Sequence, residues 1–404
     1  MSGPTPVPKL SRNVSALKDE PLAALRLELD RRAGIGDDIV DLAFGGRDDD
    51  TPRPVIDAAA RALAQGEPRR QDGRGMLELR AAGAHRWSLL SGGRPVNADN
   101  VVVNASASAG CFAACFALFE QGDFVLVPTP APPAYAAMVR LARATPVTVP
   151  GDVEWSLKIS VEDLLRVSDA RTAGLVLGSP VDPTGAVYTR TELKALLEWT
   201  RARGLWVLAD ETYRGSHFGS GPAPSVLDLP DELLERTVVV TELGAEFPGW
   251  RAGLTLAPAD VARVLARMQD AVLGAVPYAM QAGVTAALTD ARVQRDIERS
   301  GELLWYRRDT AVRYFREQLP GVEFIEPLGG PHLFFRIEAV AGGPVVDAER
   351  FCRDLLDAQG VALVPGGVFG DGRWVRLTYA VTERDLQRGL ERLAQFVHAH
   401  ERGS

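Results

Sequence analysis

The stretch from Thr241 to Gly253, T-E-L-G-A-E-F-P-G-W-R-A-G, decides how the rest of the chain is interpreted. Its second half, Pro248-Gly249-Trp250-Arg251-Ala252-Gly253, combines a proline, two glycines and an arginine, whereas its first half contains no lysine. The whole chain has four lysines, at positions 9, 18, 158 and 194, and none lies in this stretch. The function therefore depends on the segments that surround it.

Length and composition set the broad class. A chain of 404 residues exceeds one ordinary core, so we expect a large domain and a smaller one. The sequence has no apolar run long enough to span a membrane and no signal-peptide core, which predicts a cytoplasmic location. A formal charge of -8 without a basic block argues against nucleic acid or a membrane as a partner. The spacing of Cys111, Cys115 and Cys352 predicts neither a disulfide framework nor a metal site.

Two apolar runs end where open α/β sheets bind their ligands. Leu205 to Ala209 predicts a buried parallel strand, and Asp210 follows it directly. Val101 to Val103 predicts another strand, followed by Ser106-Ala107-Ser108 and then a helix. The two serines could simply cap this helix, or the segment could present backbone N–H groups to an anion.

Several segments, in the same order along the chain, resemble class I and II aminotransferases, which depend on pyridoxal phosphate. The resemblance covers about residues 40 to 400. It implies an α/β protein of fold type I, with a mostly parallel sheet flanked by helices in the large domain and a smaller α+β domain. The implied boundaries are an N-terminal arm at 1–45 that belongs to the small domain, a large domain at 46–285 and a small C-terminal domain at 286–404. The matching segments include Ser179–Gly185 (N-P-x-N-P-T-G in the family), Asp210–Tyr213 (D-E-x-Y), Pro248–Gly253 (P-G-x-R-x-G), Val364–Gly370 (V-P-G-x-x-F-G) and Trp374–Thr378.

The resemblance implies a set of cofactor-binding residues. Asp210 would pair with the pyridine nitrogen, and Tyr213 would touch the phenolic oxygen. Ser106-Ala107-Ser108 and Arg251 would bind the phosphate. Arg70 takes the place of a family tyrosine that reaches the phosphate of the neighbouring subunit, which implies a homodimer. A solvated arginine on a loop is the alternative for Arg70.

A second group of positions concerns the substrate. Gly45 lies in a loop whose backbone comes close to the substrate in the family. Arg376 holds the position of the arginine that binds a substrate α-carboxylate through two hydrogen bonds, although an arginine on an edge strand can also face solvent. His332 lies where the family often has an aromatic residue near the substrate, and it either packs or takes part in catalysis. The resemblance thus implies a small carboxylate or amino-acid-like substrate.

The chain departs from the family at its chemical centre. Counting from Pro248 places Leu243 where the family has the Schiff-base lysine, with Glu242 before it. Asp182 replaces the asparagine that donates to the phenolic oxygen, and an ionised carboxylate can only accept. Pro132 stands where an aromatic residue stacks on the ring, with Tyr135 three residues later.

Three hypotheses remain open, because the hydrocarbon side chain of Leu243 cannot carry a proton. The first is a specialised biosynthetic enzyme that binds pyridoxal or pyridoxamine phosphate non-covalently and has no ordinary transamination cycle. The second is an enzyme without a cofactor that uses Glu242, Asp182, Tyr213 or His332 as acid and base. The third is a catalytically silent homologue that acts as a binding or dimerisation partner. We favour the first.

Overall fold

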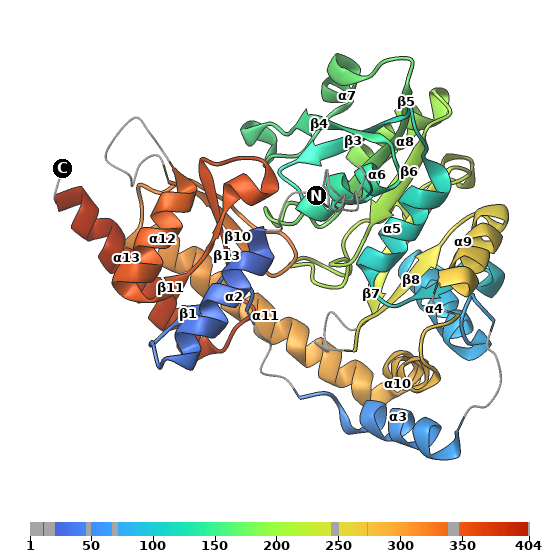
Figure 1. The fold of residues 1–404 in the computed structure, drawn as a ribbon, viewed down its shortest axis with the longest axis horizontal. Coiled ribbons are helices and arrows are strands. Elements are labelled where there is room, and N and C mark those ends of the chain that lie inside the picture. Colours follow the sequence, from blue (N-terminus) through green and yellow to red (C-terminus); the bar gives the residue numbers. More distant parts are fainter. Residues whose placement is uncertain are drawn as a thin grey trace, which may run out of the picture.

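The computed structural model describes residues 11, 21–45, 50–66, 72–243, 250–272, 274–337 and 347–402. Figure 1 shows two bodies, a larger one built around a sheet and a smaller one that contains the C-terminal helix. Arg70 and residues 244–249 lie outside the described residues, and so does the side chain of Leu243.

The larger body is built on a mixed, mostly parallel sheet with the order β2-β8-β7-β6-β5-β3-β4. β8 runs in the direction opposite to the other strands of this sheet and is antiparallel to both β2 and β7. The strands read as apolar runs because both faces of the sheet are covered. Their bounds are β2 (Val101–Asn104), β3 (Phe124–Thr129), β4 (Thr145–Pro150), β5 (Thr172–Gly178), β6 (Trp206–Asp210), β7 (Thr237–Leu243) and β8 (Ala252–Leu256).

Alternate strand residues enter two separate cores. Val207 and Val239 face one core with α4, α7, α8 and α10, whereas Leu208 and Val240 face the other with α5, α6 and α9. This arrangement of helices on both faces is that of aminotransferase fold type I, as expected. The helices of the larger body are α3 (Arg53–Gln65), α4 (Leu77–Leu90), α5 (Ala107–Leu118), α6 (Pro133–Leu141), α7 (Val161–Val167), α8 (Arg190–Ala202), α9 (Ala259–Val272) and α10 (Tyr278–Thr289).

The smaller body combines the N-terminal arm with the C-terminal part of the chain. Its four-stranded sheet has the order β12-β13-β10-β9, and β1 pairs in parallel with β11. Leu29 of the arm shares a core with Phe334 and Trp374. The bounds are α2 (Pro21–Gly34), β1 (Val40–Asp41), β9 (Phe324–Ile325), β10 (His332–Arg336), α12 (Ala348–Gln359), β11 (Val361–Ala362), β12 (Val364–Pro365), β13 (Trp374–Thr378) and α13 (Glu383–Arg402).

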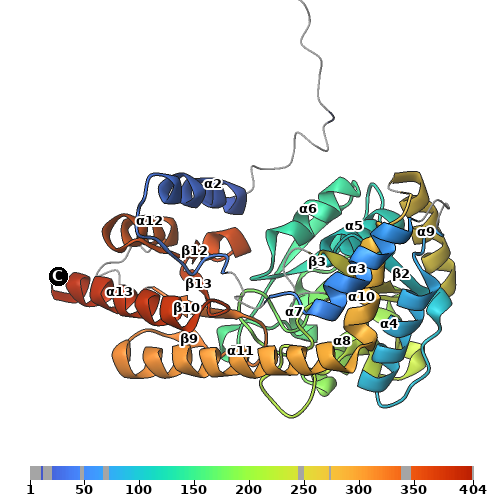
Figure 2. The ribbon, with the colours of Figure 1, turned by 90° about the horizontal axis from the view of Figure 1, so that it is seen from below.

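The helix α11 (Ala291–Gln318) connects the two bodies. It contacts α3 and α10 at one end and α13 at the other, and Figure 2 shows it running beneath both bodies. The helical stretch after Pro277 is divided, because Asp290 ends α10 and its carboxylate accepts a hydrogen bond from Arg292 N of α11 at 2.8 Å. None of the described helices is long and apolar enough to cross a membrane.

The helix α3 begins without a side-chain cap, because the residue that precedes it is Pro52. The Thr51 hydroxyl lies one residue too early and instead accepts a hydrogen bond from Trp250 Nε1 at 2.9 Å.

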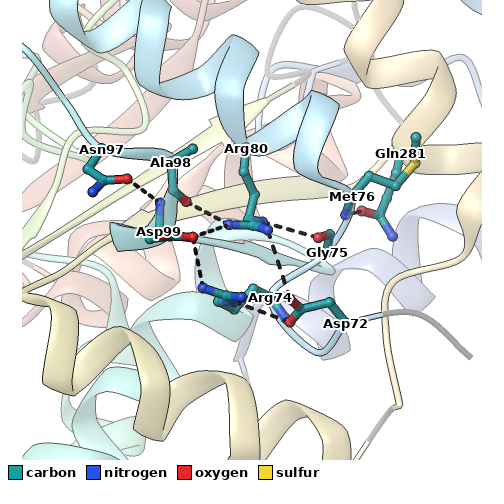
Figure 3. A network of polar contacts seen from close by, with 9 residues as sticks. All are labelled: Asp72, Arg74, Gly75, Met76, Arg80, Asn97, Ala98, Asp99 and Gln281. Carbon is teal, nitrogen blue, oxygen red and sulfur yellow. Dashed lines mark hydrogen bonds and ion pairs between the residues drawn. The ribbon is translucent and has the colours of Figure 1, made fainter.

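A polar network fixes the loop that leads into α4 (Figure 3). The Arg80 side chain, 4% exposed, donates to the carbonyl oxygen of Ala98 at 2.8 Å and to that of Gly75 at 3.2 Å. Asp99 accepts from Arg80 at 3.4 Å and from Arg74 at 3.0 Å. Arg80 therefore ties this loop to the segment that enters β2.

Candidate active site

A cavity of about 500 Å³ lies at the C-terminal ends of the central strands. Its walls come from both bodies, because Asp210 and Tyr213 belong to the larger one and His332 and Thr378 to the smaller one. Arg376 is not in the lining and contacts it through Asp182. The sequence-predicted residues in the lining are Gly45, Ser106, Ala107, Ser108, Asp182, Asp210, Tyr213, Glu242, Arg251 and His332.

Asp210 is held in place by three hydrogen bonds at the end of β6. Its Oδ2 accepts from the Tyr135 hydroxyl at 2.8 Å, and its Oδ1 accepts from Thr212 N at 3.0 Å and from Thr212 Oγ1 at 2.6 Å. Cys111 Sγ lies 4.0 Å from Oδ2. Burial raises the pKa of the Tyr135 phenol well above its usual value, so Tyr135 stays a hydrogen-bond donor. The carboxylate is thus fixed, and it still faces the cavity.

The N-terminus of α5 carries an anion that belongs to the chain itself. Ser106 caps the helix, since its Oγ accepts from Ala109 N at 3.0 Å. The Glu242 carboxylate accepts a hydrogen bond from Ala107 N. This N–H belongs to the Ser106-Ala107-Ser108 segment, which the resemblance implies as a phosphate-binding segment. The Glu242 carboxylate therefore accepts from an N–H that a phosphate was expected to use.

Asp182, His332 and Arg376 form a buried cluster. Asp182 accepts hydrogen bonds from Arg376 Nη1 at 3.0 and 3.3 Å, and Arg376 Nη2 donates to the carbonyl oxygen of Ala43 at 3.0 Å. His332 Nε2 lies 3.7 Å from Asp182 Oδ1. Arg376 is only 5% exposed, which excludes the solvent-facing alternative, and its Nε has no hydrogen-bond partner among the described residues.

These contacts set the protonation states of the cluster. Burial alone would raise the pKa of Asp182, but the charge of Arg376 outweighs it, so the pKa lies below its usual value and the group is a carboxylate. Burial, together with the charge of Arg376, lowers the pKa of His332 to about 3. The imidazole is therefore neutral at neutral pH and acts as a hydrogen-bonding group rather than as a cation.

Tyr213 and Arg251 remain available to a ligand. Burial raises the pKa of the Tyr213 phenol above its usual value, and its ring meets that of His332 edge to face with centroids 6.1 Å apart. Arg251 is exposed, has a positive φ of 41° and makes no ion pair with a described residue. The cavity thus offers one neutral phenol and one guanidinium without an ion pair to any residue that the structure describes.

Gly45 has a backbone conformation and close contacts that a residue with a side chain would not tolerate. Its φ is 66°, and an added Cβ would lie 2.7 Å from the carbonyl oxygen of Ala380 and 2.9 Å from Thr378 Cγ2. The loop at Gly45 can therefore lie directly against the smaller body at the cavity wall.

The described lysines lie away from the cavity. Lys158 Nζ contacts Glu192 at 2.6 Å, and Lys194 Nζ lies 3.6 Å from Glu198. No lysine is present in the described part of the lining.

A second, smaller cavity of about 90 Å³ lies next to the first. Its walls include Trp250 and Thr241, and Glu242 and Thr212 line both cavities. Glu242 thus stands between the two spaces.

Sequence reasoning missed the partners of three site residues. It placed Tyr135 near the ring position, but not in a hydrogen bond with Asp210. It considered Glu242 as an acid or base, and not as a partner of Ala107. The family asparagine pattern indicated the location of Asp182, whereas no local signal linked it to Arg376.

The chain is similar to known proteins over almost its whole length. Residues 37–393 match the family model for class I and II aminotransferases. A probable aspartate/prephenate aminotransferase of Aquifex aeolicus is 31% identical over 95% of this chain and 97% of its own length. The aspartate/prephenate aminotransferase of Thermus thermophilus is 32% identical over 96% of this chain and 98% of its own length.

Solved structures agree with this result. The crystal structure of the aspartate aminotransferase from Thermotoga maritima matches with a TM-score of 0.88 and 28% identity, over 96% of this chain and all of that one. The Thermus thermophilus enzyme with maleate gives a TM-score of 0.89 and 30% identity over the same shares of the two chains. The sequence motifs, the fold and these matches together show that the chain belongs to the class I and II aminotransferase family.

Proposed function

We propose that this protein is a biosynthetic enzyme that acts on a small amino-acid-like carboxylate and holds the ring of pyridoxal phosphate, pyridoxamine phosphate or their unphosphorylated forms without a covalent bond. Membership of the aminotransferase family implies dependence on pyridoxal phosphate. The observation that supports the non-covalent part is a cavity in which Asp210 accepts a hydrogen bond from Tyr135 while the described lining has no lysine. We also propose a cytoplasmic homodimer, in which Arg70 serves the site of the neighbouring subunit.

The donor set fits the ring of the cofactor. Asp210 can accept a hydrogen bond from a protonated pyridine nitrogen while Tyr135 and Thr212 hold its geometry. When bound, the cofactor supplies an electron sink for bond breaking at the amino-bearing carbon of a substrate. Tyr213 offers a phenolic hydroxyl, and Pro132 borders the cavity where an aromatic residue would stack.

The donor set does not fit the phosphate in the described arrangement. Arg251, Ser106 and Ser108 line the cavity and suit a phosphate. Glu242, however, holds Ala107 N, and its charge has the same sign as a phosphate. The phosphate therefore has no part in the proposed chemistry.

Arg376 supports a carboxylate-bearing substrate. Its buried Nε has no partner among the described residues, and a buried N–H without a partner costs free energy. Because Arg376 lies behind Asp182 and outside the cavity lining, a substrate carboxylate would satisfy this group only after Asp182 has moved aside. Asp182 already neutralises the charge of Arg376, which limits how strongly that carboxylate is held.

The proton that a family lysine would move needs another carrier. In this cavity, the Tyr213 phenol can hold a proton and the Glu242 carboxylate can accept one. Leu243 follows Glu242 at the end of β7, and its hydrocarbon side chain can do neither. An ordinary transamination cycle is therefore not proposed.

Two measurements test this function. Borohydride treatment with pyridoxal phosphate should leave no adduct on any native lysine by mass spectrometry, whereas Glu242→Ser with Leu243→Lys, which restores the family pair, is the positive control. In calorimetry, Asp210→Asn should weaken pyridoxamine binding by about tenfold or more, as expected for loss of a charge-assisted hydrogen bond. Glu120→Gln, an exposed site far from the cavity, is the control for both. A stoichiometric adduct on a native lysine would contradict the proposal.

An enzyme without a cofactor is the second candidate. The hydrogen bond from Ala107 N to Glu242 favours this candidate, because a carboxylate of the chain already accepts from the N–H that a phosphate would need. If Asp210→Asn leaves pyridoxamine binding unchanged, this candidate replaces the first. Arg251 would then anchor an anionic group of the substrate itself.

A further inference from the structure

Glu242 stands where a ligand phosphate would be expected. The helix α5 is twelve residues long, and its N-terminal N–H groups carry a partial positive charge. One of these groups, Ala107 N, donates to the Glu242 carboxylate. The chain therefore supplies its own anion to this helix.

The strand register brings Glu242 to this helix. Glu242 of β7 pairs with Gly253 of β8, and Gly253 pairs with Asn104 just before the cap of α5. An added Cβ at Gly253 would lie 2.6 Å from Ser106 C and 2.7 Å from Ala107 N. The sheet and the first residues of α5 thus lie in direct contact, so the Glu242 side chain needs only its own length to reach the helix.

A second observation concerns His332, a residue of the cavity wall. His332 is 7% exposed, and its buried Nδ1 has no hydrogen-bond partner among the described residues. A buried ring nitrogen without a partner is rare in proteins, and a turn of the ring toward the cavity would let a ligand satisfy it. The cavity therefore has one unsatisfied polar group at His332, whereas the anion-binding group at Ala107 is already satisfied.

We propose that Glu242 is a built-in competitor for the phosphate subsite, and that the cavity prefers a ligand without a phosphate at that position. A phosphorylated ligand would have to displace the Glu242 carboxylate from Ala107 N and then tolerate its charge nearby. The preferred ligand is an unphosphorylated amine-bearing ring or a similar small amine. The preference for an amine-bearing ring rests on the proposed function. The competition between Glu242 and a phosphate rests only on the contact between Glu242 and α5.

Calorimetry with three probes tests this competition. Pyridoxamine phosphate, pyridoxamine and inorganic phosphate are titrated into the wild type, Glu242→Gln, Glu242→Ala and the control Glu120→Gln. In the wild type, pyridoxamine phosphate should bind no more tightly than pyridoxamine. In Glu242→Gln, its affinity should rise by about tenfold to a hundredfold, the worth of one charged hydrogen bond, while pyridoxamine, which has no phosphate, should gain no affinity. Inorganic phosphate should bind detectably to both Glu242 variants only.

The outcomes separate this inference from the proposed function. If neither Glu242 variant gains affinity for a phosphate-bearing probe, or if the wild type already binds pyridoxamine phosphate at least about tenfold more tightly than pyridoxamine, the inference is wrong. If the Glu242 variants gain phosphate binding while no protein binds pyridoxamine, the inference stands and the ring-binding function fails. The Ala107 amide signal in nuclear magnetic resonance gives an independent readout, because it should shift in Glu242→Gln and not in Glu120→Gln.

Discussion

Asp182 Oδ1 lies 3.0 Å from Arg376 Nη1, and this buried ion pair joins the larger body to the smaller one across the cavity. It also pairs the residue that replaces a family asparagine with the arginine that the resemblance assigned to the substrate. The charge of Arg376 is therefore compensated before any substrate arrives.

Replacing Asp182 with asparagine should leave the positive charge of Arg376 without a compensating carboxylate. Asp182→Asn is expected to raise the affinity for a small dicarboxylate such as succinate by about tenfold. The reason is that Arg376 then no longer pairs with a carboxylate of the chain and can pair with one of the ligand. The variant should also lower the free energy of unfolding, and Asp182→Ala should lower it further, by about 3–5 kcal/mol, since it leaves a buried charge unpaired. Calorimetry and urea unfolding measure the two effects. Unchanged succinate affinity in Asp182→Asn would show that Arg376 does not meet the ligand.

His332 should make stability depend on pH. Its pKa is lowered from 6.5 to about 3 in the folded protein, so the unfolded chain binds the additional proton between these values. The contribution of neutral His332 is fully present above pH 6.5 and is lost as the pH falls, with a slope of up to about 1.4 kcal/mol per pH unit. His332→Gln should flatten the slope of the free energy of unfolding between about pH 4.5 and 6.5. Asp182 has a lowered pKa and loses its contribution only at lower pH, outside this window. Equal slopes for the two proteins would count against a buried neutral histidine.

Arg80 should be important for stability rather than for ligand binding. Arg80→Met removes the donor to the carbonyl oxygens of Ala98 and Gly75, and we expect a loss of about 2–4 kcal/mol in the free energy of unfolding. Arg350→Met, at a side chain that is 77% exposed, is the matched control and should change it by less than about 0.5 kcal/mol. Chemical denaturation gives both values. A loss for Arg80→Met no larger than that of the control would show that the network in Figure 3 is not important for stability.

The proposed shared site predicts complementation between subunits. Chains with Arg70→Ala and chains with Arg251→Ala are mixed in the Glu242→Gln background, where the phosphate subsite should be open. Each hybrid dimer should regain one intact site, because one subunit supplies Arg70 and the other Arg251. Pyridoxamine phosphate should then bind to hybrids at half the stoichiometry of the parent. Hybrids that bind no better than either variant alone would contradict the shared site.

The sequence predicted the fold and ten of the residues that line the cavity, because these depend on local patterns. The apolar run before Asp210 and the capped helix after Ser106 each carry their signal within a few residues. The family order of the motifs then placed them around one cavity. The divided helix at Asp290 had a local signal as well, since aspartate favours the position before a helix.

The contacts that define the chemistry could not be predicted in the same way. Glu242 meets Ala107 across 135 residues of chain, and Arg376 meets Asp182 across 194. Such pairs depend on the strand register and on how the two bodies meet, and neither is encoded near the residues themselves. The low pKa of His332 follows from burial in this assembled wall and had no local signal.

Glu242 lies between a large and a small cavity, and this location would allow two states of its side chain that differ in their affinity for a phosphate. If the carboxylate exchanges between Ala107 N and the smaller space beside Trp250, only molecules in the second state can accept a phosphate. The apparent dissociation constant for a phosphorylated ligand then equals the intrinsic constant divided by the population of that state. A substitution that only fills the smaller space would weaken phosphate binding without touching any group that contacts the phosphate.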